Sequence, residues 1–172
     1  MGETVHLAQL DNAHVLYVDK RNAAVPIEMF SQAGKVGPAY CTGVGKAMLA
    51  FLPEDRLNRL LPQMSFHRYT DTTLTSVGAL TAELADIRAC GHAFDREEHE
   101  PGIICVAAPI LSAQGRVLGA LSLTSTIART TLAALEGRAS RVKLTATRIA
   151  AEAASWRFPE DQKRAQGTGV RT

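Results

Sequence analysis

The residues with the clearest chemical potential lie in one stretch, residues 96–110, with the sequence REEHEPGIICVAAPI. It contains Glu, His and Cys, the residue types used for acid–base catalysis, nucleophilic attack and metal binding. Its thiol, Cys105, lies among Ile, Val and Ala, and apolar neighbours raise the pKa of a thiol. Packing or a place in a pocket wall is therefore favoured over nucleophilic attack. A small cysteine-dependent enzyme using Cys105 with His92 or His99 and Asp95 stays the alternative.

The acidic part of this stretch is a weak candidate for metal binding. Asp95, Glu97, Glu98 and His99 are ligand types, but the chain shows no HxH, HExxH or paired-cysteine spacing around them. A solvated acidic turn explains them better, and we expect no metal and no cofactor.

A second candidate is the glycine-rich segment YCTGVGKA, residues 40–47. It does not match the phosphate loop GxxxxGK[ST], because Tyr40 stands at the first glycine position and Ala47 follows Gly45-Lys46. The N–H groups of Gly43, Val44 and Gly45 at a helix start still suit a carboxylate. The alternative is that these glycines only permit close packing of the helix on a sheet.

The third candidate is a pair of hydroxyl residues, Ser122 and Thr124, which alternate with leucines on an expected strand. Residues 103–110 and 116–123 read as a hairpin around the loop SAQG. If Leu111 faces Arg116, then Cys105 lies opposite Ser122, on the same face as both hydroxyls. This polar face is either open to solvent or part of a ligand site.

The elements that position these residues follow from hydrophobic spacing and capping signals. The chain opens with two alternating strands, ETVHLAQLD and AHVLYVDK, joined by a turn at Asp11 and Asn12. Beyond them the sequence predicts a third strand around residues 25–30, a helix capped by Thr42, a second helix over residues 53–61, a third ending at Gly91, and one long helix over residues 131–156 with a single apolar stripe.

Composition limits the class of protein. The 172 residues, 46% of them hydrophobic, suffice for one substantial core, so we expect one domain, residues 1–158, followed by a disordered tail, residues 159–172. The formal charge is +2 and the basic residues are scattered, which argues against strong DNA binding by this chain alone. Three cysteines without paired spacing, and no membrane span or signal peptide, indicate a cytoplasmic protein.

Four segments together resemble the effector-binding domain of the IclR family of bacterial transcriptional regulators. They are GETVHLAQLDNAHVLYVDK, PAYCTGVGKAMLAFLP, ALTAELADIRACGHAFDREEHEPGIICVAAPI and GRVLGALSLT, and they run in order over residues 2–156. The most specific parts are the patterns T-G-x-G-K-A-x-L-A and G-x-A-x-D-x-E-E-x-x-P-G-x-x-C-x-A-A-P.

The resemblance implies an α/β (α+β) fold related to GAF and PAS domains, with an antiparallel sheet flanked by helices and a long C-terminal helix. It also implies an effector pocket, whose residues carry over by motif as Met29, Gly43, Val44, Asp95, Cys105, Ser122 and Thr124. Val44 and Thr124 stand where smaller residues are common, which narrows the pocket.

We therefore expect a binding module rather than an enzyme. Its ligand would be a small organic acid (a keto acid, sugar acid or aromatic acid), with the carboxylate on the helix start and the far end on Asp95, Cys105 and the hydroxyls. The family also implies a dimer or tetramer, and operator DNA read only by an N-terminal winged helix-turn-helix domain that this chain lacks. A purely structural oligomerisation domain is a third possibility.

Overall fold

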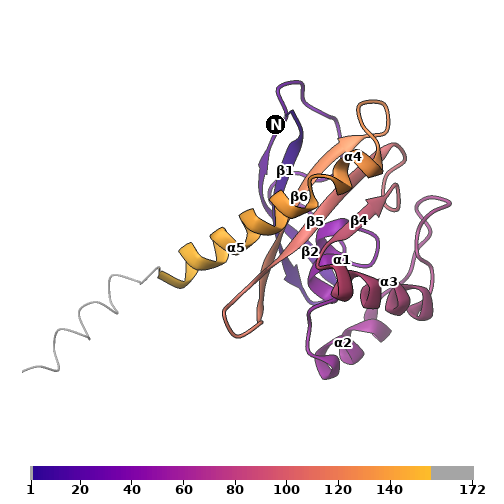
Figure 1. The fold of residues 1–172 in the computed structure, drawn as a ribbon. Coiled ribbons are helices and arrows are strands. Elements are labelled where there is room, and N and C mark those ends of the chain that lie inside the picture. The colour runs from indigo at the N-terminus through magenta and orange to yellow at the C-terminus, as the bar shows by residue number, and fades with distance from the viewer. Residues whose placement is uncertain (1, 156–172) are drawn as a thin grey trace, which may run out of the picture.

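The computed structural model describes residues 2–155, which form one antiparallel sheet with helices on both faces (Figure 1). The strands are β1 (Thr4–Asp11), β2 (His14–Arg21), β3 (Val36–Pro38), β4 (Ala93–Arg96), β5 (Ile103–Leu111) and β6 (Val117–Thr126). The helices are α1 (Gly43–Leu49), α2 (Glu54–Leu60), a 3-10 turn (Leu61–Gln63), α3 (Val77–Cys90), α4 (Leu132–Glu136) and α5 (Ala139–Ser155). This architecture confirms the expected fold class.

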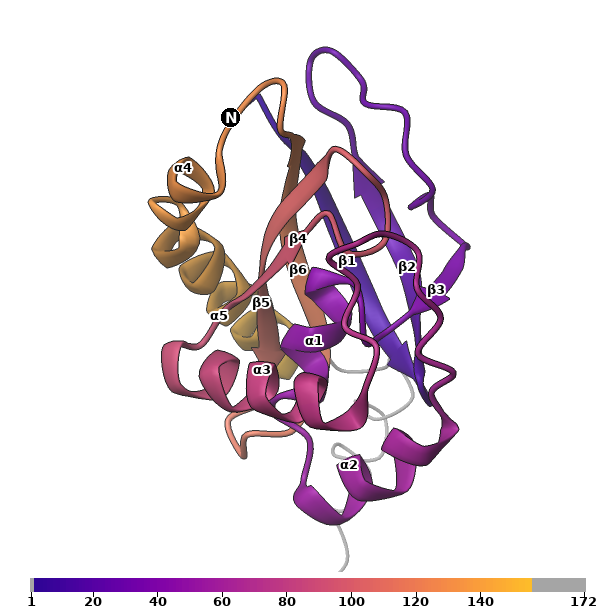
Figure 2. The ribbon, with the colours of Figure 1, turned by 90° about the vertical axis from the view of Figure 1, so that its right-hand side faces the viewer.

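The strand order β3-β2-β1-β6-β5-β4 brings the first and last hairpins together at the centre of the sheet. Helices α1 and α3 cover one face and α4 and α5 the other, with α2 beside α3 at one end (Figure 2). Each face has its own cluster of buried apolar side chains. No helix within residues 2–155 is long and apolar enough to span a membrane.

The first hairpin forms as expected, since Asp11 pairs with His14 and Asn12 adopts the left-handed conformation that a tight turn needs. The strand expected around residues 25–30 was wrong. Ile27, Met29 and Ser31 are buried alternately, which imitates a strand pattern. Pro26, however, has no N–H to donate, and residues 25–30 pair with no strand. The third strand is instead β3.

The hairpin of β5 and β6 forms, but its register differs from the expected one by two residues. Cys105 pairs with Thr124 rather than with Ser122, and the ladder is irregular between Ile110 and Leu111. Because side chains alternate with a period of two, this shift leaves the same residues on the same face. Cys105, Ser122 and Thr124 therefore share one face, as expected.

The helix predictions are confirmed except at the C-terminus. Helix α3 begins where the Ser76 Oγ accepts the N–H of Ala79 and ends at Gly91 in the left-handed conformation. The long C-terminal helix is divided at residues 137–138, where Gly137 weakens helix formation. Its stripe packs on the sheet from Leu135 to Ala150, whereas Ala153 is exposed; Trp156 and residues 159–172 lie outside the described residues.

Candidate functional site

The candidate site is a hollow between the start of α1 and the polar face of the central strands. Its free volume is about 30 Å³, which is enough for about one water molecule. Of the residues expected to bind an effector, the structure brings together Gly43, Val44, Asp95, Cys105, Ser122 and Thr124 around it.

The remaining two expected residues lie outside the wall of this hollow. Met29 is a buried residue of the segment that joins β2 to β3. Gly45 faces the backbone of Ala39, and a Cβ at this position would collide with the Ala39 carbonyl oxygen. Gly45 therefore allows α1 to lie close to the preceding chain.

One wall of the hollow is a polar cluster around His6, which the sequence analysis missed. His6 is opposite Ser122 in the β1–β6 ladder. Its Nδ1 lies 3.2 Å from the Thr124 Oγ1 and 3.3 Å from the Ser122 Oγ, and its Nε2 lies 3.0 Å from the Ser31 Oγ. Burial lowers the pKa of His6 to about 4, so the ring is neutral at physiological pH and has one donor and one acceptor nitrogen.

The opposite wall is the start of α1 against β5. A Cβ at Gly43 would collide with the Cys105 Sγ and lie 3.5 Å from the Ala107 Cβ. The glycine is thus needed for close packing of helix on sheet, whatever its N–H group binds. Burial, followed by the charge of nearby Asp95, raises the pKa of the Cys105 thiol, so the thiol is neutral.

Asp95 closes the site from β4, a strand that the sequence analysis did not predict. It pairs with Cys105 in the β4–β5 ladder, and its Oδ1 accepts the N–H of Glu98 at 2.8 Å. Burial and then the neighbouring Glu98 carboxylate raise the pKa of Asp95 to about 7. A substantial fraction of this carboxyl group is protonated at neutral pH and can donate a hydrogen bond.

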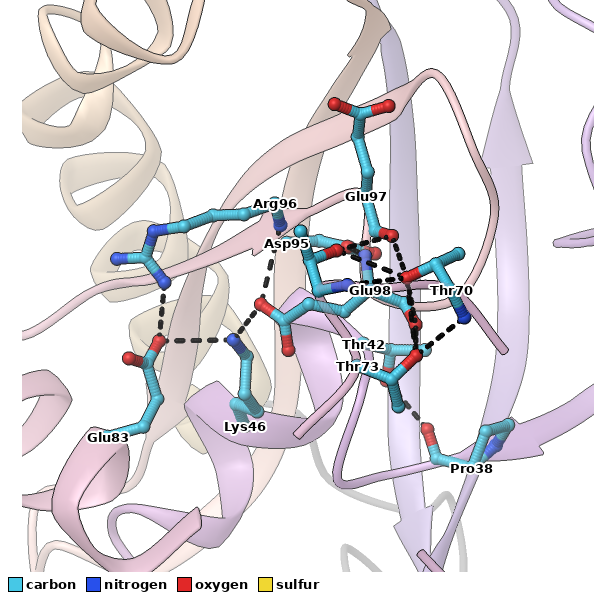
Figure 3. Close-up of polar contacts among 11 residues, drawn as sticks. Pro38, Thr42, Lys46, Thr70, Thr73, Glu83, Asp95, Arg96, Glu97 and Glu98 are labelled. Carbon is cyan, nitrogen blue, oxygen red and sulfur yellow. Dashed lines mark hydrogen bonds and ion pairs between the residues drawn. The ribbon is translucent and has the colours of Figure 1, made fainter. Parts of the chain in front are cut away.

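Behind Asp95 lies an ion cluster, the Lys46 cluster, which consists of buried Lys46 and Glu98 and of the more exposed Glu83 and Arg96 (Figure 3). The fully buried Lys46 Nζ contacts the Glu98 Oε1 and lies 3.0 Å from the Glu83 Oε1, and Arg96 donates to the same Glu83 oxygen at 2.7 Å. The cluster ties the Asp95 turn to α1 and α3.

The turn after β4 is also fastened to the connection between α2 and α3. The Thr70 Oγ1 donates to the Glu97 carbonyl oxygen and the Thr73 Oγ1 to the Glu98 carbonyl oxygen, both at 2.7 Å (Figure 3). Within residues 2–155, no group of His, Cys, Asp and Glu side chains is arranged to hold a metal ion.

The hollow has further wall residues that the sequence analysis did not assign to an effector site: Tyr17, Ser31, Thr42, His99, Glu100 and Ile103. A signal for His6 exists, because Thr4 and His6 alternate with Val5 and Leu7 as the two hydroxyls alternate with leucines on β6. Its meaning depends on the pairing of β1 with β6, which joins strands more than 100 residues apart.

Comparisons with known proteins place this chain in one family. The family model described as "Bacterial transcriptional regulator IclR C-terminal" matches residues 1–151. The HTH-type transcriptional regulator XynR of Escherichia coli is 38% identical over 128 residues, covering 74% of this chain and 51% of XynR. The chain thus spans about half the length of this relative.

Solved structures agree. The crystal structure of the Thermotoga maritima IclR superposes with a TM-score of 0.83 and 34% identity, covering 88% of this chain and 61% of that one. The inducer-binding domain of the PobR transcription factor from Acinetobacter, a double mutant in complex with 3-hydroxybenzoic acid, gives a TM-score of 0.76 at 25% identity, covering 86% and 87%. The chain belongs to the IclR family of bacterial transcriptional regulators, in which it corresponds to the C-terminal domain.

Proposed function

We propose that this chain is the effector-sensing and oligomerisation domain of its regulator and that it binds a small organic acid in the hollow. Binding would modulate DNA recognition by a helix-turn-helix domain elsewhere in the protein. The observation that carries the proposal is a buried face bearing His6, Ser122, Thr124 and Asp95, where a sheet packed only for stability would carry apolar residues.

The polar groups suit the two ends of such an acid. The carboxylate would accept hydrogen bonds from the N–H groups of Gly43 and Val44. Protonated Asp95 would donate a hydrogen bond to the far end of the ligand. The far end would meet Cys105 and the hydroxyls of Ser122 and Thr124. Gly45 would support the helix start, and Met29 would contact the ligand only if its own segment, between β2 and β3, moves.

The PobR complex supports the choice of ligand class, because a domain of the same fold holds an aromatic acid. In the present structure the hollow must widen to admit any acid of a few carbon atoms, since about 30 Å³ is close to the space of one water. The free energy needed for widening reduces affinity, so we expect dissociation constants of about micromolar to millimolar.

The cysteine-enzyme alternative is not supported. The relatives are transcriptional regulators, a family of non-enzymes. Burial raises the pKa of Cys105, whereas a catalytic thiol needs a lowered one. His92 is not among the residues that line the hollow with Cys105. His99 is among them, but a neutral buried thiol offers it no thiolate to act with.

Calorimetry against keto acids, sugar acids and aromatic acids tests the proposal. We expect at least one class to bind and to raise the melting temperature, and Ser122→Ala to lower its affinity by about 0.5–1.5 kcal/mol, the net value of one neutral hydrogen bond. Ser140→Ala, at an exposed position on α5, is the matched control and should leave affinity unchanged. If no acid binds, the sensing function is refuted; unchanged affinity in Ser122→Ala would place the ligand elsewhere.

A further inference from the structure

A larger cleft adjoins the hollow. Its volume is about 570 Å³, within the range of about 300–1,000 Å³ typical of small-molecule sites, whereas the hollow has about 30 Å³. The cleft lies between β3 and the connection from α2 to α3, which runs beside β3 toward the turn between β4 and β5 (Figure 2). It is the natural place for any part of a ligand that the hollow cannot hold.

The same two side chains, His99 and Glu100, line both spaces. The His99 ring lies between Phe30 and Tyr69, with centroids 5.2 and 4.7 Å away. The Glu100 carboxylate accepts the N–H of Phe30 at 2.9 and 3.0 Å. The partition between hollow and cleft is therefore made of side chains that rest on the segment between β2 and β3, rather than of strand backbone.

The cleft is lined for an aromatic or flat apolar group. Phe30, Tyr69 and Val36 remain 40%, 43% and 48% exposed, and all three gather on this cleft, where ligand burial would remove them from water. Tyr40 adds a ring oriented by its hydrogen bond to the His67 carbonyl oxygen at 2.6 Å. Neither space has a Lys or Arg among the described residues that line it. The acidic end is assigned to the hollow because the N–H groups of Gly43 and Val44 lie there.

We infer that the hollow and the cleft are two compartments of one site, and that the effector is an aromatic acid with its carboxyl end in the hollow and its ring in the cleft. This inference rests on the proposed sensing function and names the class of acid. The side chains of His99 and Glu100 must rotate away for such a molecule to span both compartments. This movement breaks the hydrogen bond from the Phe30 N–H to the Glu100 carboxylate.

Three probes separate the compartments: phenol (a ring without an acid), pyruvate (an acid without a ring) and phenylpyruvate (both). We expect phenol to shift the amide resonances of Phe30 and Tyr69 in the isotope-labelled chain. We expect phenylpyruvate to bind at least about tenfold more tightly than pyruvate, since ring burial contributes apolar area and aromatic contacts.

Substitutions in the cleft and in the hollow measure how much each compartment contributes to ligand affinity. Tyr69→Ala should weaken phenol and phenylpyruvate by roughly three- to tenfold, the range for loss of one aromatic contact, and leave pyruvate unchanged. Ser122→Ala should weaken both acids and leave phenol unchanged. Phe30→Ala provides a second cleft variant. Val77→Ala is the control, because Val77 is also 43% exposed but lies on α3 away from the cleft.

The results distinguish this inference from the function on which it rests. If phenol shifts no resonance of the cleft, or if Tyr69→Ala and Phe30→Ala leave phenylpyruvate affinity unchanged, the cleft is no compartment of the site even when small acids bind in the hollow. If phenol binds in the cleft but phenylpyruvate shifts no resonance of the hollow, the two spaces are not joined. If no acid of any class binds, the sensing function itself fails.

Discussion

Gly43 lies against Cys105 where α1 begins, and this contact sets how closely the helix approaches β5. We predict that Gly43→Ala lowers the free energy of unfolding by about 1–3 kcal/mol, the usual cost of overpacking. Adding Cys105→Ala removes the sulfur atom that the new methyl group meets, so the double variant should recover part of the loss. Urea denaturation of both single variants and the double variant measures this coupling.

The matched control for this prediction is Gly78→Ala in α3, where an added Cβ meets nothing within 4 Å. There we expect a gain of about 0.5–1 kcal/mol, because alanine favours a helix over glycine. Strictly additive effects of Gly43→Ala and Cys105→Ala would contradict a direct contact between the two positions.

The raised pKa of Asp95 predicts that the stability of the fold depends on pH. Burial and the Glu98 carboxylate raise its pKa from the ordinary value of 3.8 to about 7 in the folded state. The folded chain therefore keeps a proton that the unfolded chain has lost, and this group's contribution to stability falls as pH rises from about 4 to 7. Above this window Asp95 is ionised in both states, and the penalty of burying its charge is complete.

We expect Asp95→Asn to be more stable than the unchanged chain at pH 8, by about 1–3 kcal/mol. The amide oxygen can still accept the Glu98 N–H, so the turn should keep its shape. Thermal melts between pH 4 and pH 8 provide the measurement, with Asp86→Asn, at an exposed position of α3, as control. Parallel pH profiles for Asp95→Asn and the unchanged chain would show that Asp95 does not titrate as described.

The Lys46 cluster joins three elements: α1, α3 and the end of β4. The Lys46 side chain has no contact with solvent. Lys46→Met should cost about 3–5 kcal/mol, because it leaves buried Glu98 without its counter-charge. Glu98 is already held at a raised pKa by burial, and its Oε2 has no hydrogen-bond partner among the described residues. Urea denaturation measures the loss.

The control is the exposed pair of Arg59 and Asp55 on α2, whose side chains are 68% and 70% exposed. Arg59→Met should change stability by no more than about 0.5 kcal/mol. The double variant Lys46→Met/Glu98→Gln should recover part of the Lys46→Met loss, since no unpaired charge then remains. A Lys46→Met chain as stable as the Arg59→Met chain would mean that the cluster is not buried in solution.

The elements with local signals could be predicted from the sequence. Gly91 predicts the end of α3, and the alternation around Asn12 predicts the first hairpin, because both depend on hydrogen bonds and backbone angles within a few residues. The shared face of Cys105, Ser122 and Thr124 was also predictable, since a register error of two residues preserves it.

The features that the sequence analysis predicted wrongly or missed depend on contacts between residues distant in sequence. Residues 25–30 alternate between buried and exposed positions although they pair with no strand, so periodicity alone imitates β structure there. His6 joins the site only through the β1–β6 pairing, and Asp95 only through edge strand β4. The cleft depends on three separate connections meeting at His99, which no local pattern indicates.

The two faces of the sheet differ in role across the whole molecule: one carries the candidate site and the other packs against the C-terminal helices. The face under α1 and α3 is interrupted by the hollow and the polar cluster around His6. The other face carries a cluster of apolar side chains, on which α4 and α5 pack from Leu135 to Ala150. Helix α5 therefore uses its stripe on its own sheet and contributes stability there. Its outer face remains available, with Leu144 60% exposed.

We expect this domain to associate with a second copy of itself. A regulator that reads a two-fold DNA site must itself pair, so we expect this chain to form a dimer with a dissociation constant of about tens of micromolar, as for modest interfaces. Both edge strands are short, three and four residues, and short edges resist strand pairing. The edges are thus weaker candidates for the interface than the exposed apolar side chains Leu144 and Ile127, which are 60% and 56% exposed.

Sedimentation equilibrium tests both the pairing and its location. Leu144→Lys should weaken the dimer by at least about tenfold if α5 forms the interface, since a buried lysine without a partner is costly, whereas Val36→Lys on edge strand β3 should leave it intact. The reverse result would move the interface to the sheet edge. A mass of 18.5 kDa at millimolar concentration, with and without ligand, would show that this domain does not pair, and oligomerisation would then have to come from other parts of the regulator.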